Sequence, residues 1–85
     1  MPTVQLTIIG KPDCHLCDIA ASVIDSVVSD LDGSVSVDVV KQSILDDTEL
    51  HERYWEKIPV ILVNGVEHSH WHVNPDTLRT AILKG

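Results

Sequence analysis

The chain has 85 residues, of which 44% are hydrophobic, and its 13 acidic and 6 basic side chains give a formal net charge of −7. This length suits one domain with one core, which we expect to span residues 1–85. The negative charge argues against nucleic acid or an anionic membrane surface as a partner. No apolar stretch reaches the roughly 20 residues that span a bilayer, and no secretory leader is visible. We therefore expect a cytoplasmic monomer that acts on proteins or small molecules.

The first part of the chain predicts a strand followed by a long helix. Alternating apolar residues predict a strand over Val4–Ile9, which Gly10 ends. A helix then opens at Asp13 or Cys14 and stops at Asp32-Gly33, a typical C-terminal glycine signal. Its apolar residues recur at intervals of three and four, namely Leu16, Ile19, Ala20, Val23, Val27, Val28 and Leu31.

The middle of the chain predicts a second strand and a shorter helix. Alternating valines predict a strand over 35–39, and the helix between the two strands indicates a right-handed crossover and a parallel pair. Asp46 and Glu49 have the spacing of a capping box and open a helix that runs through Tyr54. This helix has to end before Pro59, because the residue preceding a proline is disfavoured in the helical region.

The last part of the chain predicts a hairpin and a third helix. The wholly apolar run Val60–Val63 is typical of a strand that is covered on both faces. Asn64-Gly65 predicts a type I′ turn, and the returning strand covers Val66–His72. Asn74 can cap a last helix with Pro75 at its first position. The element order is βαβ-α-ββα, an α/β arrangement.

The motif Cys14-His15-Leu16-Cys17 falls where the first strand passes into the long helix. A thiolate at a helix N-terminus meets unpaired backbone N–H groups and the positive end of the helix dipole, which can lower a thiol pKa below its free value of about 8.5. Lys11 and a protonated His15 would add positive charge and are candidate substrate contacts, whereas Asp13 and Asp18 oppose that charge. This placement favours thiol–disulfide exchange, with Cys14 as the nucleophile and Cys17 as the resolving cysteine.

Two other interpretations of the cysteines stay open at this point. An incidental buried pair would carry no chemistry, although reactive cysteines are typically sited at helix N-termini. Half of a zinc site would need four ligands, and the chain has two cysteines and five histidines.

Taken together, these residues resemble the thioredoxin superfamily, and in particular a family of small glutaredoxin-like proteins, over essentially the whole chain. The resemblance rests on the cysteine motif, on Ile58-Pro59-Val60 before the third strand and on Asn64-Gly65 in the hairpin. The stretch from Glu49-Leu50 to Lys57-Ile58-Pro59-Val60 is also similar to the small family. The resemblance implies a thioredoxin fold of the glutaredoxin type, with a four-stranded mixed sheet and three helices.

The same resemblance implies a role for Ile58 and Pro59. In the superfamily, the proline before the third strand follows a cis peptide bond and faces the redox cysteines. We therefore expect a cis Ile58-Pro59 bond, with the Ile58 backbone pairing with a docked substrate chain.

Two departures from glutathione-using glutaredoxins concern the reductant. Those proteins carry a Gly-Gly pair after the final strand, where this chain reads Trp71-His72-Val73-Asn74-Pro75-Asp76, and a Pro-Tyr interior in the cysteine motif. The resemblance therefore supports dithiol chemistry more strongly than it supports the use of glutathione. Glutathione stays a candidate co-substrate, and no cofactor is expected. Asp76, at the start of the last helix, is a candidate to bind an amine or a carboxylate of the substrate.

Three histidines and a tryptophan follow in the last strand. His68, His70 and His72 alternate, so on a strand they would project from one face. Side chains two apart on a strand lie about 6–7 Å from each other, too far for three ligands of one ion, and we expect no metal site. Trp71 is expected to cover the core beneath the last helix.

The leading interpretation is a thiol–disulfide oxidoreductase that acts on a disulfide-containing protein or on a small-molecule thiol or disulfide. One alternative is a thioredoxin-fold module that binds a partner protein without catalysis. The other alternative is a metal-handling protein that uses the cysteine pair.

Overall fold

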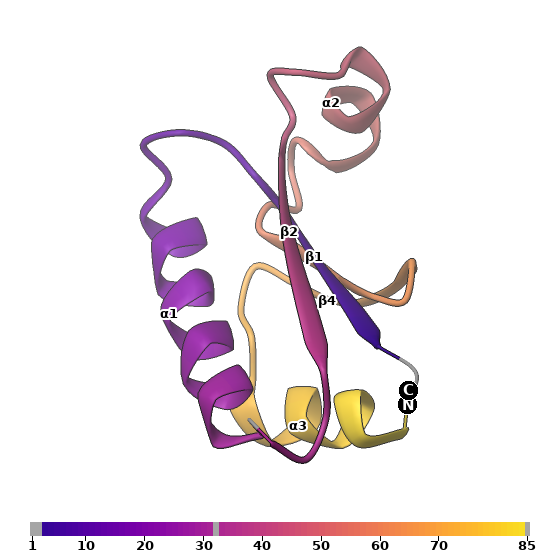
Figure 1. The fold of residues 1–85 in the computed structure, drawn as a ribbon. Helices are drawn as coiled ribbons and strands as arrows, with labels where there is room; N and C mark the ends of the chain where they lie inside the picture. Colours follow the sequence, from indigo (N-terminus) through magenta and orange to yellow (C-terminus); the bar gives the residue numbers. More distant parts are fainter. Residues whose placement is uncertain (1–2, 32, 85) are drawn as a thin grey trace.

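The computed structural model describes residues 3–31 and 33–84, which form one mixed sheet with three helices. The elements are β1 (Val4–Gly10), α1 (His15–Asp30), β2 (Val37–Ser43), α2 (Thr48–Tyr54), β3 (Val60–Val63), β4 (Val66–His70) and α3 (Pro75–Lys84). The strands pair in the order β2-β1-β3-β4, with β1 and β2 parallel and the other pairs antiparallel. In Figure 1, α1 runs alongside the sheet, α3 lies near the far end of α1, and α2 lies at the opposite end. The expected thioredoxin fold of the glutaredoxin type is confirmed.

Two apolar clusters form on the two faces of the sheet. Because successive strand residues point to opposite faces, β1 contributes to both clusters. Leu6 and Ile8 pack with Ile61 on the side of α1 and α3. Ile9 packs with Val60 on the side of α2. β1 is therefore the central strand of the molecule, and six of its seven residues are buried.

The buried stripe of α1 is rotated relative to the predicted one. Ala20, Ile24 and Val27 are buried, whereas Leu16 and Ile19 are 37% and 46% exposed. The prediction included Leu16 and Ile19 and omitted Ile24. Periodicity shows that a helix has an apolar side. Which residues at the edges of a broad apolar stripe become buried depends on the sheet against which the helix packs.

The ends of the two longer helices follow the predicted signals. α1 ends at Asp30 with Leu31 as its C-cap, and Gly33 follows with φ of +88°, a conformation that favours glycine. Asp32, the other residue of that signal, lies outside the described residues. The side chain of Asn74 accepts two backbone N–H groups from the first turn of α3. Among residues 3–31 and 33–84, no helix combines the length and apolarity needed to cross a membrane.

β2 lies further along the chain than predicted. It covers Val37–Ser43 and pairs with all seven residues of β1, whereas the valine pattern predicted 35–39. Val35 donates its backbone N–H to the carbonyl of Leu31 at 3.1 Å, in the turn after α1. The polar residues at the end of β2 belong to the strand because β1 supplies their backbone partners, a contact that the local sequence does not reveal.

The β3–β4 hairpin has the predicted turn and a shorter second strand. Asn64 and Gly65 have φ of 52° and 83°, which confirms the positive φ that a type I′ turn needs at both positions. β4 ends at His70 and not at His72. The strand stops there because Trp71 has φ of 64°, far from extended backbone.

Asp47, and not the predicted Asp46, caps α2. Its carboxylate accepts the backbone N–H groups of Glu49 at 2.9 Å and Leu50 at 3.3 Å. Asp46 belongs to the preceding turn, where its N–H bonds to the carbonyl of Ser43 at 3.1 Å. The predicted capping-box spacing was therefore wrong by one residue.

Replacing the cap should destabilise the protein measurably. We expect Asp47→Ala to lower the free energy of unfolding by about 1 kcal/mol, because two N–H groups of α2 lose their acceptor. Urea unfolding followed by circular dichroism measures this difference. Asp46→Ala removes the same charge without removing a cap and should stay within about 0.5 kcal/mol of the wild type. Equal losses in the two variants would contradict the assignment of the cap.

Candidate active site

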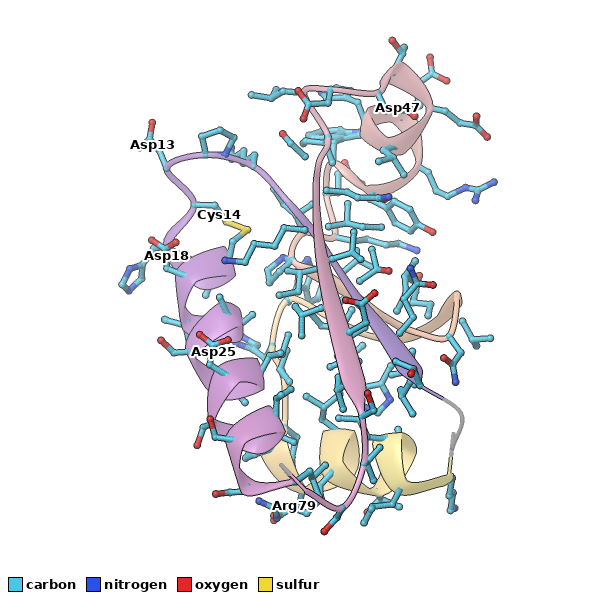
Figure 2. All side chains as sticks on the ribbon, viewed as in Figure 1. Asp13, Cys14, Asp18, Asp25, Asp47 and Arg79 are labelled. Atoms are coloured by element: carbon cyan, nitrogen blue, oxygen red, sulfur yellow. A yellow bond between two sulfur atoms is a disulfide. The ribbon has the colours of Figure 1, made fainter. Side chains whose placement is uncertain are left out.

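The two cysteines lie at the start of α1, on the turn that leaves β1 (Figure 2). Cys14 and Cys17 form a disulfide with their Cα atoms 5.2 Å apart, within the usual range for such a bond. Both residues are half-buried, and His15 and Leu16 between them are exposed. The structure thus brings the two predicted catalytic cysteines together at the surface, with the predicted contact residue His15 beside them.

Cys14 is the N-cap of α1, with extended backbone angles (φ −107°, ψ 112°). Its Sγ accepts a hydrogen bond from the backbone N–H of Cys17 at 3.2 Å. Asp13, directly before it, has φ of 58°, a conformation that aspartate adopts more readily than most residues. A helix N-terminus favours negative charge, and an N–H group that points at sulfur stabilises a thiolate relative to a thiol. In the reduced protein, both features would stabilise negative charge on Sγ of Cys14, whereas Asp18 in the first turn of α1 opposes it.

Gly10 allows Cys17 to lie against the end of β1. A Cβ atom built on Gly10 would stand 2.7 Å from Sγ of Cys17 and 3.3 Å from its Cβ. The first distance is shorter than real contacts permit, so a side chain at Gly10 would displace the cysteine or the strand. From the sequence, Gly10 was predicted only to end a strand. Its position four residues before Cys14 could have indicated a contact with the cysteine motif, but that contact depends on how α1 folds back over β1.

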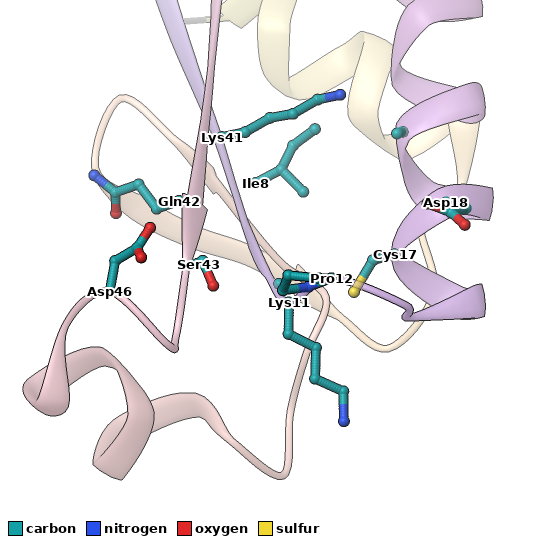
Figure 3. A pocket seen from close by; sticks show the side chains of 11 residues that line it. Ile8, Lys11, Pro12, Cys17, Asp18, Lys41, Gln42, Ser43 and Asp46 are labelled. Atoms are coloured by element: carbon teal, nitrogen blue, oxygen red, sulfur yellow. The ribbon is translucent and has the colours of Figure 1, made fainter.

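A cleft of about 280 Å³ opens beside Cys17, between the first turns of α1 and the carboxyl ends of β1 and β2 (Figure 3). It is lined by Ile8, Gly10, Lys11, Pro12, Cys17, Asp18, Ala21, Lys41, Gln42, Ser43 and Asp46. Lys11, a predicted contact residue, lies in this lining together with Lys41, which the sequence analysis missed. Lys41 has no motif around it. The parallel pairing of β2 with β1 is what carries it to the cleft, where it extends toward α1 (Figure 3).

Ile58 and Pro59 stand next to the end of β1. The bond between them is cis, the isomer that the resemblance implies. Val60 pairs with Ile9, so the antiparallel register places Pro59 beside Gly10, against which Cys17 packs. Pro59 is buried and Ile58 is half-buried. Both predicted residues thus lie at the same end of the sheet as the disulfide.

Asp76, the remaining predicted contact residue, does not lie at the end of the sheet that carries the disulfide. Arg79 bonds to Asp76 at 3.4 Å and to Asp30, the last residue of α1, at 3.1 Å. Cys14 caps the first turn of the same helix, whose 16 residues span about 24 Å at 1.5 Å per residue. Arg79 and Cys14 accordingly appear at opposite ends of α1 in Figure 2.

His68, His70 and His72 do not alternate along one regular strand, contrary to the sequence-based expectation. The pairing shifts between Ile61 and Leu62, so His68 has no opposite residue in β3, and β4 ends before His72. A bulge of this kind interrupts the alternation on which the expectation rested. Among the residues that the structure describes, no group of three or more His, Cys, Asp or Glu side chains is placed to hold a metal ion.

Trp71 does not cover the core as predicted. Its side chain is 50% exposed, and the indole Nε1 donates to the carbonyl of Glu56 at 2.7 Å. The ring therefore reaches the loop that precedes Pro59.

The Gly10 contact predicts a redox-dependent loss of stability. We expect Gly10→Ala to lower the free energy of unfolding by about 1–3 kcal/mol in the oxidised protein and by less in the reduced one, where the Cys17 thiol can rotate away from the added methyl. Urea unfolding of both redox forms measures the two losses. Gly33→Ala is the control, because nothing lies within 4 Å of its Cβ and its positive φ is equally strained in both forms. Equal losses in the two redox forms of Gly10→Ala would contradict the contact.

Comparisons with known proteins agree with this geometry. Residues 5–83 match the family model described as Glutaredoxin-like domain (DUF836). Uncharacterized proteins of Mycobacterium tuberculosis and Mycobacterium bovis are 26% identical over 81 residues, which cover 94% of this chain and 84% of theirs.

Two solved structures show the same arrangement. A structural genomics target from X. campestris is 25% identical, with a TM-score of 0.72 over 94% of this chain and 97% of its own. Chloroplastic thioredoxin z has a TM-score of 0.73 over 96% of this chain and 77% of its own, and at 17% identity it shows the fold alone. With a family model that matches almost its whole length, the chain belongs to the glutaredoxin-like domain family of the thioredoxin superfamily.

Proposed function

We propose that the protein is a thiol–disulfide oxidoreductase that passes two electrons between its Cys14–Cys17 pair and the disulfide of a partner. The observation that carries the proposal is the position of Cys14 at the N-cap of α1, with the Cys17 N–H directed at its sulfur. Membership of a glutaredoxin-like family and the thioredoxin fold support it.

The reaction needs only the two cysteines and the partner disulfide. In the reduced protein, the Cys14 thiolate attacks one sulfur of the partner, breaks its S–S bond and forms a mixed disulfide, while the released partner thiolate takes up a proton. The Cys17 thiol then loses its proton and attacks Sγ of Cys14, which releases the second partner thiol. The partner gains two electrons, and the protein is left with the Cys14–Cys17 disulfide.

The two cysteines take different roles because their surroundings differ. Cys14 receives the backbone N–H at the helix start, which favours its thiolate. Cys17 lies against Gly10, where its sulfur is held within bonding distance of Cys14. This asymmetry makes Cys14 the nucleophile and Cys17 the resolving residue.

Three predicted contact residues surround the pair and complete the proposed site. His15 is exposed next to Cys14, and Lys11 lines the cleft beside Cys17. Ile58 precedes the proline that stands beside Gly10. Electrons for a new cycle would come from a thiol such as glutathione or from a protein dithiol. Asp76 has no part in this proposal, because it lies at the other end of α1.

Removing the resolving cysteine should trap the partner. We expect Cys17→Ser to accumulate a mixed disulfide on Cys14, because the second step has lost its thiol. Mass spectrometry of the adduct, isolated without reductant, distinguishes glutathione from a protein partner. Cys14→Ser is the matched control and should form no adduct. An adduct on Cys17 of that control, with none on Cys14 of the first variant, would reverse the assigned roles.

The position of Cys14 also predicts how its reactivity depends on pH. In Cys17→Ser, which keeps the backbone N–H at residue 17, we expect the alkylation rate to reach half its maximum clearly below about pH 8.5, the pKa of a free thiol. The rate of iodoacetamide addition across a pH series measures this midpoint. The same variant unfolded in urea loses the helix and should return to the free-thiol value. Identical midpoints in the folded and unfolded protein would contradict activation by the helix.

A further inference from the structure

Trp71 has a backbone conformation that tryptophan rarely adopts. Its φ of 64° lies in the left-handed region, which costs about 1–2 kcal/mol for a residue with a Cβ. Such a conformation persists only where the surroundings compensate for it. The contacts of Trp71 therefore show which part of the structure this backbone conformation holds in place.

The hydrogen bonds that Trp71 donates go to the segment before and including Pro59. The backbone N–H of Trp71 is shared between the carbonyls of Pro59 at 2.9 Å and Lys57 at 3.2 Å. Its indole Nε1 donates to the carbonyl of Glu56 at 2.7 Å. His70 packs edge-on against the ring, with the ring centroids 4.8 Å apart. One residue thus binds three of the four carbonyls of segment 56–59.

Ile58 is the member of that segment that Trp71 leaves unbound. Within residues 3–31 and 33–84, neither the N–H nor the C=O of Ile58 bonds to another backbone group. Ile58 is half-buried, and backbone groups with limited access to water are normally paired. A residue before a proline favours extended backbone, and the N–H and C=O of an extended residue point to the same side, where a neighbouring chain can pair with both. The segment therefore presents a vacant backbone pairing position.

This vacant position lies close to the disulfide. The register aligns Gly10, Pro59 and Trp71 at one end of the sheet, because Ile9 pairs with Val60 and Val60 pairs with His70. Strands are about 4.8 Å apart, so Trp71 stands about 10 Å from Gly10. Gly10 carries the Cys17 contact.

We infer that Trp71 is a positioning residue, which holds segment 56–59 so that Ile58 can pair with an extended polypeptide that carries the substrate disulfide. The inference rests on the proposed function and names its substrate class. A vacant N–H and C=O pair selects for peptide backbone. The net charge of −7 further disfavours a small anionic disulfide.

Two substrates with the same leaving group test this inference. One is a short linear peptide whose single cysteine carries a nitrothiobenzoate, and the other is dithiobis-nitrobenzoate, which has no peptide. Single-turnover release of nitrothiobenzoate by the reduced protein gives the half-saturating concentration and the limiting rate for each. Trp71→Gly removes the ring and relieves the positive φ, and Trp71→Phe removes the indole N–H but keeps an aromatic ring. Trp55→Phe is the control, because Trp55 is equally exposed and stacks on His51.

We expect Trp71→Gly to raise the half-saturating concentration of the peptide about tenfold, with little change for the small disulfide. Trp71→Phe should shift it in the same direction, and Trp55→Phe should not. Hydrogen exchange at the amide of Lys57, which bonds to the carbonyl of Tyr54, should be faster in both Trp71 variants, as a measure of the segment that does not depend on activity.

Three results would count against the inference. If both Trp71 variants change the two substrates by the same factor, Trp71 has a structural role only. If the half-saturating concentration and the limiting rate for the peptide are unchanged in both Trp71 variants, pairing of the peptide with Ile58 does not depend on Trp71. If the wild type releases nitrothiobenzoate from neither substrate, the proposed function itself is refuted, and the inference falls with it.

Discussion

The contact between Cys17 and the backbone of Gly10 is the constraint on which the site depends. A side chain at Gly10 would take the space of the cysteine sulfur, so the first turn of α1 could not approach the end of β1 this closely. Because β1 is paired with β2 on one side and β3 on the other, its end is held in place by the whole sheet. The N-terminus of α1, where Cys14 is the N-cap, is thereby positioned by a strand that is paired along both edges.

The loops around this contact depart most from ordinary backbone preference. Asp13 and Trp71 both have positive φ; one precedes the cysteine motif, and the other ends β4 beside Pro59. The conformation of Trp71 is held by hydrogen bonds to three carbonyls. Departures of this kind concentrate at functional sites, where the fold compensates for local cost. The site is thus built from a rigid strand end and two loops that it holds in unusual conformations.

Sequence reasoning succeeded where the structural cause is local, and it was wrong where a neighbouring element decides. Asn64 and Gly65 form the predicted turn because their own φ preferences specify it. The bounds of β2 were wrong because β1 sets how far the pairing extends. Leu16 was assigned to the buried stripe of α1, yet it is exposed within the cysteine motif, since the sheet selects which edge of the stripe it covers. The Asp47 cap differed by one residue for the same kind of reason.

The sequence by itself determined the order βαβ-α-ββα and the place of Cys14 at a helix start, because both follow from periodicity and turn residues close together in the chain. The tertiary structure alone decided which distant residues join the cysteines. It brought Lys41 to the cleft and Trp71 to segment 56–59, and it left Asp76 at the far end of α1. These placements depend on strand register and on packing between elements, which single-sequence patterns do not encode.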